Sequence, residues 1–362
     1  MKVLIIFSSG KIGGAEKSLT LMSHYSNKNL GCNYDLASIG GEGEWSDWAR
    51  SLNFYPRLSK PGKGGIRDII EITKFIKNSK FDIVYAIGLR VSVILRIIKF
   101  LFKMKFILIH GVRWVPSGNN ILDFSTRFVE KYFSLLIDGY ITNSKACRNV
   151  LEKDCLINNS KLFTIYNGVS NEKTIKTKIK RKKILTVANL SPRKGYLEYL
   201  KVIKKVNQKY PDASFHFIGL DNMSGAVSRA IKENNLSHCV SYLGFIKDIK
   251  KELLSSYLFV LPSLYSEGCP TSIMEAMQYK IPCVAYDICG INELIIDKKT
   301  GLLAKKDDQE MLAESICELI TNKVLYRKMS IASEERIKNY FTLESCSKNH
   351  LKTFSELYNK IN

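Results

Sequence analysis

Short strand-like runs alternate with longer segments of helical periodicity in the first half of the chain. Residues 3–7 form a continuous apolar run, and residues 15–25 follow with apolar side chains three and four positions apart. Further short runs come at residues 82–86, 106–109 and 139–142. Strands that alternate with helices predict βαβ units, and therefore a parallel sheet covered by helices on both faces.

The same alternation begins again in the second half of the chain. Predicted strands lie at residues 184–187, 214–219, 240–243, 257–261 and 282–285. Two such series predict an α/β fold of two doubly wound domains. Ligands of this kind of domain bind at the carboxyl ends of the strands.

A polar and strongly basic stretch at residues 171–183 separates the two series. The pair Asn167-Gly168 comes just before it and favours a turn, because both residue types tolerate left-handed backbone. We therefore place one Rossmann-like domain at residues 1–168 and a second at residues 169–341. Residues 342–362 form a last helical segment.

The chain carries a formal net charge of +21 over 362 residues. Such a charge attracts polyanions, among them anionic lipids and phosphorylated ligands, although a proteome whose surfaces drift basic explains it equally well. Residues 90–105, RVSVILRIIKFLFKMK, predict a helix with an apolar face and a cationic face. That pattern suits an anionic membrane surface, and the alternative is a core-facing helix with a solvated lysine face. Nucleic acid is not an expected partner, because no RNP, zinc-finger or helix-turn-helix pattern is present.

The nine cysteines are odd in number and irregularly spaced. They form no CxxC pair and no Cys/His cluster with the spacing of metal ligands, so we expect free thiols in a reducing cytoplasm and no metal site. No apolar run reaches the length of about 18 residues that a membrane-spanning helix needs. These features predict a cytoplasmic protein that lies peripherally on the inner face of the cytoplasmic membrane.

The stretch SEGCPTSIMEAM, residues 266–277, combines two carboxylates with a predicted helix start. Glu267 precedes Pro270, whose ring favours the first turn of a helix, and Glu275 lies eight residues after Glu267. The free backbone N–H groups from Thr271 onward suit a phosphate, and a carboxylate can accept both protons of a diol. A nucleotide sugar has diols on both sides of a diphosphate and fits this pattern. The alternative is that one glutamate is a loop charge and the other a helix-surface residue.

Two further motifs point to a phosphorylated ligand. Ser191-Pro192-Arg193-Lys194-Gly195 follows the predicted strand at residues 184–187, and a lysine before a helix start is well placed for diphosphate charge. Gly13-Gly14-Ala15-Glu16 lies in the loop after the first strand, where glycine lets a ligand approach the backbone closely.

Together these motifs resemble those of the retaining glycosyltransferases of family four. The resemblance runs the length of the chain and rests on Glu267-x7-Glu275, on GGAE at residues 13–16, on IPCVA at residues 281–285 and on Gly290-x-x-Glu293. It implies the GT-B fold, in which two Rossmann-like domains face each other across a cleft. The N-terminal domain then binds the acceptor, the C-terminal domain binds the nucleotide sugar, and the last helix crosses back to the N-terminal domain.

The resemblance also implies roles for individual residues. Glu267 contacts sugar hydroxyls, Glu275 holds the ribose diol, and Lys194 is the phosphate lysine. His110, which follows the predicted strand at residues 106–109, matches the cleft histidine of the family and joins Glu267 and Lys194 as catalytic. The remaining implied positions are Gly14, Arg193, Gly268, Cys269, Pro270 and Thr271 for the donor, Gly219, Phe245 and Ile246 for the nucleotide base, and Lys11, Gly13 and Arg113 for the acceptor.

The expected activity is the transfer of a sugar, with retention, from a nucleotide-diphosphate sugar, of the UDP type, to a hydroxyl acceptor, with no metal or other cofactor. The acceptor expected for such bacterial enzymes is a lipid-linked glycan of an envelope polysaccharide such as capsule or O-antigen. One departure from the family is Asn189, where an arginine is common; Arg193 is the candidate to replace that cation.

Three alternatives differ from this interpretation. A nucleotide-sugar epimerase of the same fold needs catalytic acids and a histidine arrangement that the sequence does not match. A nicotinamide dehydrogenase needs GxGxxG after the first strand, and residues 9–14 do not provide it. A non-catalytic protein that binds polyanions or membrane surfaces explains the charge, but it leaves Glu267 and Glu275 without a role.

Overall fold

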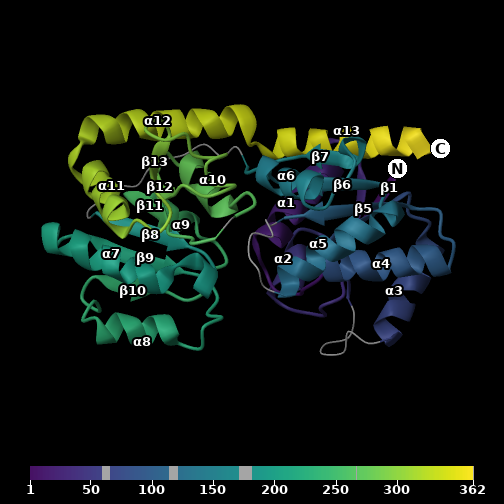
Figure 1. The fold of residues 1–362 in the computed structure, drawn as a ribbon, viewed down its shortest axis with the longest axis horizontal. Coiled ribbons are helices and arrows are strands. Elements are labelled where there is room, and N and C mark those ends of the chain that lie inside the picture. The colour runs from purple at the N-terminus through teal and green to yellow at the C-terminus, as the bar shows by residue number, and fades with distance from the viewer. Residues whose placement is uncertain (59–65, 114–120, 171–181, 266, 362) are drawn as a thin grey trace. The chain divides into compact units, whose positions relative to one another are not determined.

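The computed structural model describes residues 1–58, 66–113, 121–170, 182–265 and 267–361. The chain divides into two compact units (Figure 1). The N-terminal unit consists of Met1–Gly168 together with Leu343–Asn362, and the C-terminal unit consists of Val169–Thr342. Most of the basic stretch that the sequence marks as a linker, residues 171–181, lies outside the described residues.

A sheet of seven parallel strands forms the centre of the N-terminal unit. Its strand order is β3-β2-β1-β4-β5-β6-β7, which is that of a doubly wound sheet. The sequence patterns predicted β1, β4, β5 and β6 and missed the other three strands. The strands are β1 (Lys2–Phe7), β2 (Asn33–Ser38), β3 (Arg57–Leu58), β4 (Ile83–Ile87), β5 (Ile107–Val112), β6 (Gly139–Thr142) and β7 (Leu162–Thr164).

Both faces of this sheet are buried. Leu4 and Ile6 of β1 belong to one apolar cluster, while Ile5 and Phe7 belong to a second cluster on the opposite face. A strand that is covered on both sides is apolar at every position, which explains the continuous run at the start of the sequence. The first cluster includes residues of α3 (Ile66–Ser79), α4 (Leu89–Leu101) and α6 (Lys145–Lys153), and the second includes residues of α1 (Gly14–Asn29), α2 (Glu44–Ser51) and α13 (Leu343–Ile361).

The last helix, α13, is part of the N-terminal unit although it is the end of the chain. Its Phe354 and Leu357 are buried in the second cluster, and the Phe354 ring lies 5.7 Å from the ring of Tyr85. The chain enters and leaves the C-terminal unit at neighbouring points, because Val169 donates a backbone hydrogen bond to the Phe341 carbonyl at 2.9 Å.

The C-terminal unit repeats the architecture around a six-stranded parallel sheet. Its order β10-β9-β8-β11-β12-β13 reverses direction between β8 and β11, which is the switch point where ligands bind in such folds. Its strands are β8 (Lys183–Val187), β9 (Ser214–Ile218), β10 (Val240–Tyr242), β11 (Leu258–Leu261), β12 (Cys283–Tyr286) and β13 (Gly301–Ala304). Its helices are α7 (Tyr196–Lys209), α8 (Ala226–Glu233), α9 (Lys250–Leu254), α10 (Thr271–Gln278), α11 (Gln309–Thr321) and α12 (Lys323–Tyr340).

The basic segment at residues 90–105 is helical only as far as Leu101, where α4 ends. One of its predicted surface cations, Arg96, is buried and pairs with Glu130 of α5 (Ile121–Phe133) at 2.5 Å. Arg96 therefore does not belong to the exposed cationic face that the sequence predicts, because it pairs with a buried carboxylate. Lys103 and Lys105, which follow the helix, remain exposed.

Among the described residues, no helix is both long enough and apolar enough to cross a membrane. All nine cysteines are free thiols, as their irregular spacing predicts.

Candidate functional site

The loops after β8 and β11 bring together the two charged residues that the sequence singled out in the C-terminal unit. Lys194 donates a hydrogen bond from Nζ to Oε1 of Glu267 at 2.5 Å, and Ser263 donates from Oγ to the same oxygen at 2.7 Å. The guanidinium of Arg193 lies 3.8 Å from Oε2 of Glu267. The site is therefore a carboxylate held by two cations and a hydroxyl, at the carboxyl ends of two adjacent strands.

Burial and charge act in opposite directions on Glu267, whose side chain is only 7% exposed. Burial raises the pKa of this carboxyl, but the Lys194 ammonium, the Arg193 guanidinium and the hydrogen bonds outweigh it and leave the pKa below its ordinary value. Glu267 is thus an acceptor of hydrogen bonds at neutral pH. A carboxylate in that state can bind the hydroxyl groups of a sugar.

Gly195 lets the loop that carries Lys194 approach the end of β11. This glycine has a φ of +68°, and a Cβ there would come within 2.2 Å of the Pro262 carbonyl oxygen. The approach also allows the Leu264 N–H to donate to the Arg193 carbonyl at 3.0 Å. The short 3-10 turn Pro192–Lys194 and the start of α7 are therefore fixed against the loop that bears Glu267.

Gly290 fixes the same loop from the opposite side. A Cβ at this position would lie 2.1 Å from the Glu267 carbonyl oxygen and 2.2 Å from that of Gly268, and its φ of +86° favours glycine in any case. The Glu267 N–H donates to the Cys289 carbonyl at 3.0 Å. The glycine of the Gly290-x-x-Glu293 pattern therefore has a direct structural role in placing Glu267.

The helix after Glu267, α10, begins at Thr271, and Pro270 stands at its N-cap without a side-chain hydrogen bond to the helix. The backbone N–H groups of the first turn are thus not capped by that residue. Gly268 and Cys269 are buried. Glu275 is only half-buried, although its neighbours Met274 and Ala276 are fully buried, so it lies at the edge of the packed face of the helix.

The predicted nucleotide-base residues lie at the ends of β9 and β10. Gly219 follows β9, and its N–H donates to the Gly244 carbonyl at 3.0 Å, while the Tyr242 hydroxyl donates to the Gly219 carbonyl at 2.8 Å. Phe245 comes directly after Gly244 and is exposed, and Ile246 is half-buried. An exposed aromatic ring at the carboxyl end of a strand is suited to stacking on a base.

Asn189 occupies a position where the family commonly has an arginine that binds phosphate. In this structure its side chain makes a hydrogen bond between two loops instead. Its side-chain oxygen accepts a hydrogen bond from the Leu220 N–H at 3.0 Å and so joins the loops after β8 and β9. Arg193 is the cation of this loop whose side chain is most exposed, at 42%. It therefore remains available for an anionic ligand.

The predicted residues of the loop after β1, which are Lys11 and Gly13 for the acceptor and Gly14 for the donor, belong to the N-terminal unit. Lys11 is exposed, Gly13 is the N-cap of α1, and Gly14 is the first residue of that helix. Glu16 lies in the first turn of α1, where burial raises its pKa to about 6 despite backbone hydrogen bonds that oppose the shift.

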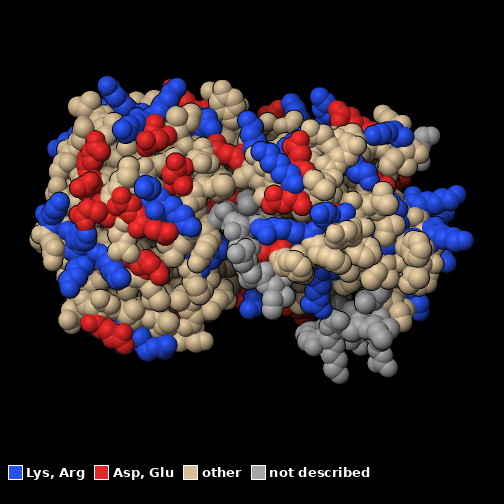
Figure 2. Space-filling view, viewed as in Figure 1, with Lys and Arg blue, Asp and Glu red and all other residues tan. Residues whose placement is uncertain are grey.

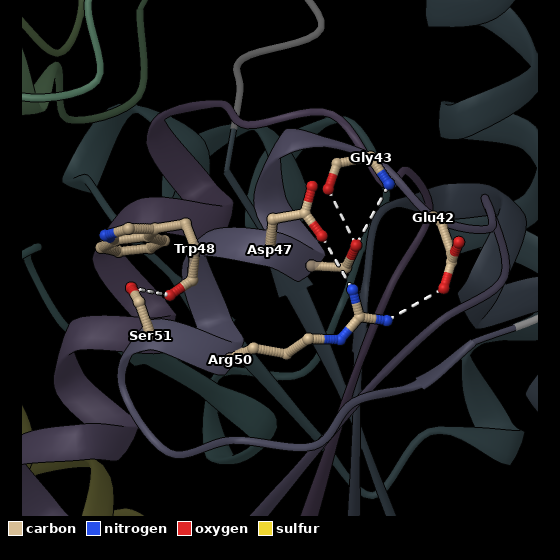
Figure 3. Close-up of polar contacts among 7 residues, drawn as sticks. Glu42, Gly43, Asp47, Trp48, Arg50 and Ser51 are labelled. Carbon is tan, nitrogen blue, oxygen red and sulfur yellow. Dashed lines mark hydrogen bonds and ion pairs between the residues drawn. The ribbon is translucent and has the colours of Figure 1, made fainter.

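The segment before α2 supports this loop. The Trp45 N–H donates to the Gly10 carbonyl at 3.1 Å, and Ser46 exchanges side-chain hydrogen bonds with the Gly43 backbone at 2.8 and 3.1 Å. Figure 3 shows Arg50 reaching both Asp47 and Glu42, with N–O distances of 2.7 and 2.9 Å. These contacts hold the chain from Glu42 to Arg50 beside the loop after β1.

The position of His110 differs from the sequence expectation. Strand β5 continues to Val112, so His110 lies within the strand instead of following it, and only 2% of the residue is exposed. Its Nδ1 lies 3.0 Å from Oε1 of Glu130. Only the opposite edge of the ring, with Nε2, is left for a ligand.

Glu130 is the centre of a buried polar network that the sequence patterns do not predict. Besides His110 it contacts Arg96 at 2.5 Å and accepts a hydrogen bond from the Tyr140 hydroxyl at 2.7 Å. Burial raises the pKa of Glu130, but the contacts with His110 and Arg96 and the hydrogen bond from Tyr140 outweigh burial and lower the pKa to about 2. The carboxylate therefore stays charged inside the unit.

Arg113, not His110, follows β5 directly. Its guanidinium donates to the Tyr85 hydroxyl at 2.7 Å and to the side-chain oxygen of Asn167 at 2.8 Å. These contacts hold a cation at the carboxyl edge of the N-terminal sheet. Among the described residues, no group of three or more His, Cys, Asp or Glu side chains is arranged to hold a metal ion.

Known protein families match both halves of the chain. The model of Glycosyltransferase Family 4 matches residues 12–173, and that of Glycosyl transferases group 1 matches residues 170–336. The two matches join into one span from residue 12 to residue 336, and they agree with two doubly wound domains. The protein is thus a glycosyltransferase with the GT-B fold. It belongs to family four of these enzymes, as the resemblance predicted.

Two relatives extend the comparison. The chain is 26% identical over 300 residues to the UDP-Gal:alpha-D-GlcNAc-diphosphoundecaprenol alpha-1,3-galactosyltransferase of Escherichia coli, a match that covers 77% of this chain and 76% of that protein. It is 28% identical to the poly(ribitol-phosphate) alpha-N-acetylglucosaminyltransferase of Staphylococcus aureus, over 60% of this chain and 44% of that protein.

Among solved structures, HepE of Anabaena in complex with UDP and glucose has the same fold. It superposes with a TM-score of 0.86 at 19% identity, over 98% of this chain and 99% of the other. The family matches favour a transferase over an epimerase and over a non-catalytic binding protein.

Proposed function

We propose that this enzyme transfers a sugar, with retention of anomeric configuration, from a UDP-sugar to a hydroxyl of a lipid-linked glycan in the synthesis of an envelope polysaccharide such as capsule or O-antigen. The observation that carries the proposal is the arrangement of Glu267 with Lys194, Arg193 and Ser263 at the switch point of the C-terminal sheet. The activity of the Escherichia coli relative supports a UDP-sugar donor and a lipid-linked acceptor, and that of the Staphylococcus aureus relative supports an envelope polymer as the product.

The donor is proposed to bind along the carboxyl edge of the C-terminal sheet. Phe245 and Ile246 face the base, Glu275 accepts the ribose hydroxyls, and the diphosphate meets Lys194, Arg193 and the first turn of α10 at Thr271. Glu267, which Gly290 holds in place from behind, accepts hydrogen bonds from the sugar hydroxyls. Gly268, Cys269 and Pro270 form the backbone between the two glutamates.

In the proposed reaction, the bond between the anomeric carbon and the diphosphate oxygen breaks while a bond from that carbon to the acceptor oxygen forms on the same face of the sugar. The acceptor proton passes to the departing diphosphate, so no protein base is needed. Lys194 and Arg193 stabilise the charge that develops on the diphosphate, which is the electrostatic contribution that a metal supplies in other enzymes. We therefore propose a metal-independent enzyme.

The N-terminal unit is proposed to bind the acceptor through Lys11, Gly13 and Arg113, with the Nε2 edge of His110 directed to the transferred sugar. A lipid-linked acceptor places the enzyme at the inner face of the cytoplasmic membrane.

The test is a reaction of the purified protein with UDP-galactose, UDP-glucose or their N-acetyl forms and a diphosphoundecaprenol-linked acceptor, in the presence of EDTA. The expected product has an α-linkage by proton NMR, matching the α-configured donor. A β-linked product would contradict retention, and activity only after Mg²⁺ is added would contradict metal independence.

A further inference from the structure

Helix α5 is amphipathic in the opposite sense to a normal surface helix. Its polar residues Asp123, Thr126 and Glu130 are buried, while the aromatic residues on its other side are exposed. Phe124 is 69% exposed and Phe128 is 49% exposed. An ordinary helix on a sheet turns its apolar face to the core, whereas the buried polar contacts of α5 leave its aromatic side chains on the surface of the unit.

The exposed aromatic residues of α5 lie on one side of the helix. Phe124, Phe128 and Tyr132 are four residues apart, a spacing that places side chains above one another, and the rings of Phe128 and Tyr132 are 4.9 Å apart. Lys131 lies 5.7 Å from the centre of the Tyr132 ring.

The end of the neighbouring helix α4 extends this apolar surface. Phe100, Leu101 and Phe102 are each more than 60% exposed. Buried polar contacts join the two helices, because Arg96 of α4 pairs with Glu130 of α5 and also donates to the Val129 carbonyl. We define the docking face as Phe100, Leu101, Phe102, Phe124, Phe128 and Tyr132. Contiguous exposed apolar surface of this kind marks an interaction site.

The charge around the docking face is mainly positive. Two partly exposed acids beside it, Asp138 and Asp154, pair with Lys99 of α4 and Arg127 of α5. The sequence from residue 89 to residue 137 has only two acidic residues, Asp123 and Glu130, and both are buried. Arg90, Lys103, Lys105 and Lys131 are exposed. In Figure 2 the surface over α4 and α5 is mostly uncharged, with lysine and arginine side chains at its margin.

We propose that the docking face lies on an anionic lipid bilayer, with its aromatic rings in the headgroup region and its lysines on anionic lipids. Aromatic side chains and cations around them are the combination that such an interface favours. A second copy of the chain fits less well, because a symmetric contact would bring the same cations together, while the nearby acids Asp138 and Asp154 already pair with Lys99 and Arg127. The inference deepens the proposed function, since the acceptor of that reaction is lipid-linked.

The first experiment is cosedimentation of the full chain with vesicles of phosphatidylglycerol and phosphatidylcholine in equal amounts, and with vesicles of phosphatidylcholine alone. The wild type is expected to bind the anionic vesicles more tightly. The triple variant Phe124→Ser, Phe128→Ser and Tyr132→Ser should lose at least about tenfold in affinity. The matched control, Tyr55→Ser with Val324→Ser and Tyr340→Ser, removes three large exposed apolar side chains from other places and should bind as the wild type does.

The second experiment changes charge alone. Replacing Lys103, Lys105 and Lys131 by glutamate should lower affinity for the anionic vesicles at least about tenfold, whereas the same exchange at the exposed residues Lys299, Lys305 and Lys306 should change it much less. Both triple variants have the same net charge, so the comparison separates the docking face from the general charge of the chain.

Three results would overturn the inference: no preference of the wild type for anionic vesicles, equal binding by the aromatic variant and its control, or a wild-type dimer that the aromatic variant converts to a monomer without any vesicle binding. The last result would assign the face to a second copy of the chain. The rise in Tm on adding UDP reports the proposed donor site in the other unit, so failure of the docking face and failure of the proposed function are distinguishable.

Discussion

Lys194 and Glu267 are 73 residues apart in the sequence, yet Nζ of the lysine lies 2.5 Å from Oε1 of the glutamate. The two residues follow β8 and β11, which are neighbours at the point where the strand order of the C-terminal sheet reverses. In the proposed donor site, this pair places a cation for a diphosphate next to an acceptor for sugar hydroxyls. It also makes the charge state of each residue depend on the other.

The first prediction concerns this pair. Lys194→Ala should weaken UDP binding about 10- to 100-fold, because a hydrogen bond to a charged phosphate is lost. It should also lower the free energy of unfolding by about 3 kcal/mol, since Glu267 loses its closest counter-ion while still buried. Isothermal titration with UDP and urea denaturation measure the two effects.

The double variant Lys194→Ala with Glu267→Gln separates the two effects. It should recover most of the lost stability, because the uncompensated charge is gone, while UDP binding stays weak. Recovery of UDP binding in the double variant would show that Lys194 acts only as a structural partner of Glu267.

The second prediction concerns Arg193, the candidate to replace the arginine missing at Asn189. Arg193→Ala should raise the Kd for UDP about tenfold, whereas Asn189→Ala should change it little and should cost about 1 kcal/mol of stability, because the Leu220 N–H loses its acceptor. Arg327→Ala, at an exposed position of α12, is the control for loss of one positive charge. Equal Kd values for Arg193→Ala and Arg327→Ala would remove Arg193 from the donor site.

The third prediction concerns pH and Glu130. The pKa of this carboxyl is about 2 in the folded protein, against about 4.5 for the free group, so its contribution to stability is complete above about pH 4.5 and is lost as the pH falls toward 2. Glu130→Gln should therefore lower the free energy of unfolding by about 3 kcal/mol at pH 7 and by progressively less below pH 4.5. Urea denaturation between pH 7 and pH 3 measures the difference.

The exposed ion pair of Figure 3 provides the control for Glu130. Glu42→Gln removes a carboxylate that pairs with Arg50 at the surface, and it should change stability by no more than about 0.5 kcal/mol at any pH. A similar loss of stability in both variants would mean that the buried network around Glu130 stabilises the protein no more than an exposed ion pair does.

The fourth prediction concerns Glu16, whose pKa is shifted in the opposite direction to that of Glu130. Burial raises the pKa of Glu16 to about 6, so this residue favours the folded state fully below about pH 4.5, and that contribution is lost as the pH rises through 6. Glu16→Gln keeps the shape and cannot ionise, so it should raise stability by about 1 kcal/mol at pH 8 and leave it unchanged at pH 4. Thermal unfolding of both proteins across this pH range is the measurement, and a variant that is less stable at pH 8 would contradict it.

Much of the architecture could be predicted from the sequence, for a physical reason. Strands such as β1 and β11 are covered on both faces and leave continuous apolar runs, while β2 (NYDLAS) and β3 (RL) are polar or short and leave no such signal. Glu267 and Lys194 could be found because their motifs are local. Ser263 and the contact of Gly290 with the Glu267 loop depend on chain segments that meet only in the folded unit.

Two features could not be predicted from the sequence, because they depend on residues that meet only in the folded unit. The segment at residues 121–133 is amphipathic, and its pattern alone predicts aromatic residues in the core; the buried pairing of Arg96 with Glu130 reverses that orientation. His110 was expected after a strand that in fact continues to Val112. In both cases a partner distant in sequence decides where the side chain points.

The most direct test of the central claim measures the release of nucleotide diphosphate from a panel of nucleotide sugars, with lipid acceptor and EDTA present. The account predicts release from a UDP-sugar by the wild type and by the control Glu314→Ala, which changes an exposed glutamate of α11 in the same unit. Glu275→Ala should reduce the rate at least about 100-fold, since the ribose hydroxyls lose their charged acceptor. Release at the same rate from all three proteins, or no release by the wild type from any nucleotide sugar, would contradict the proposed donor site.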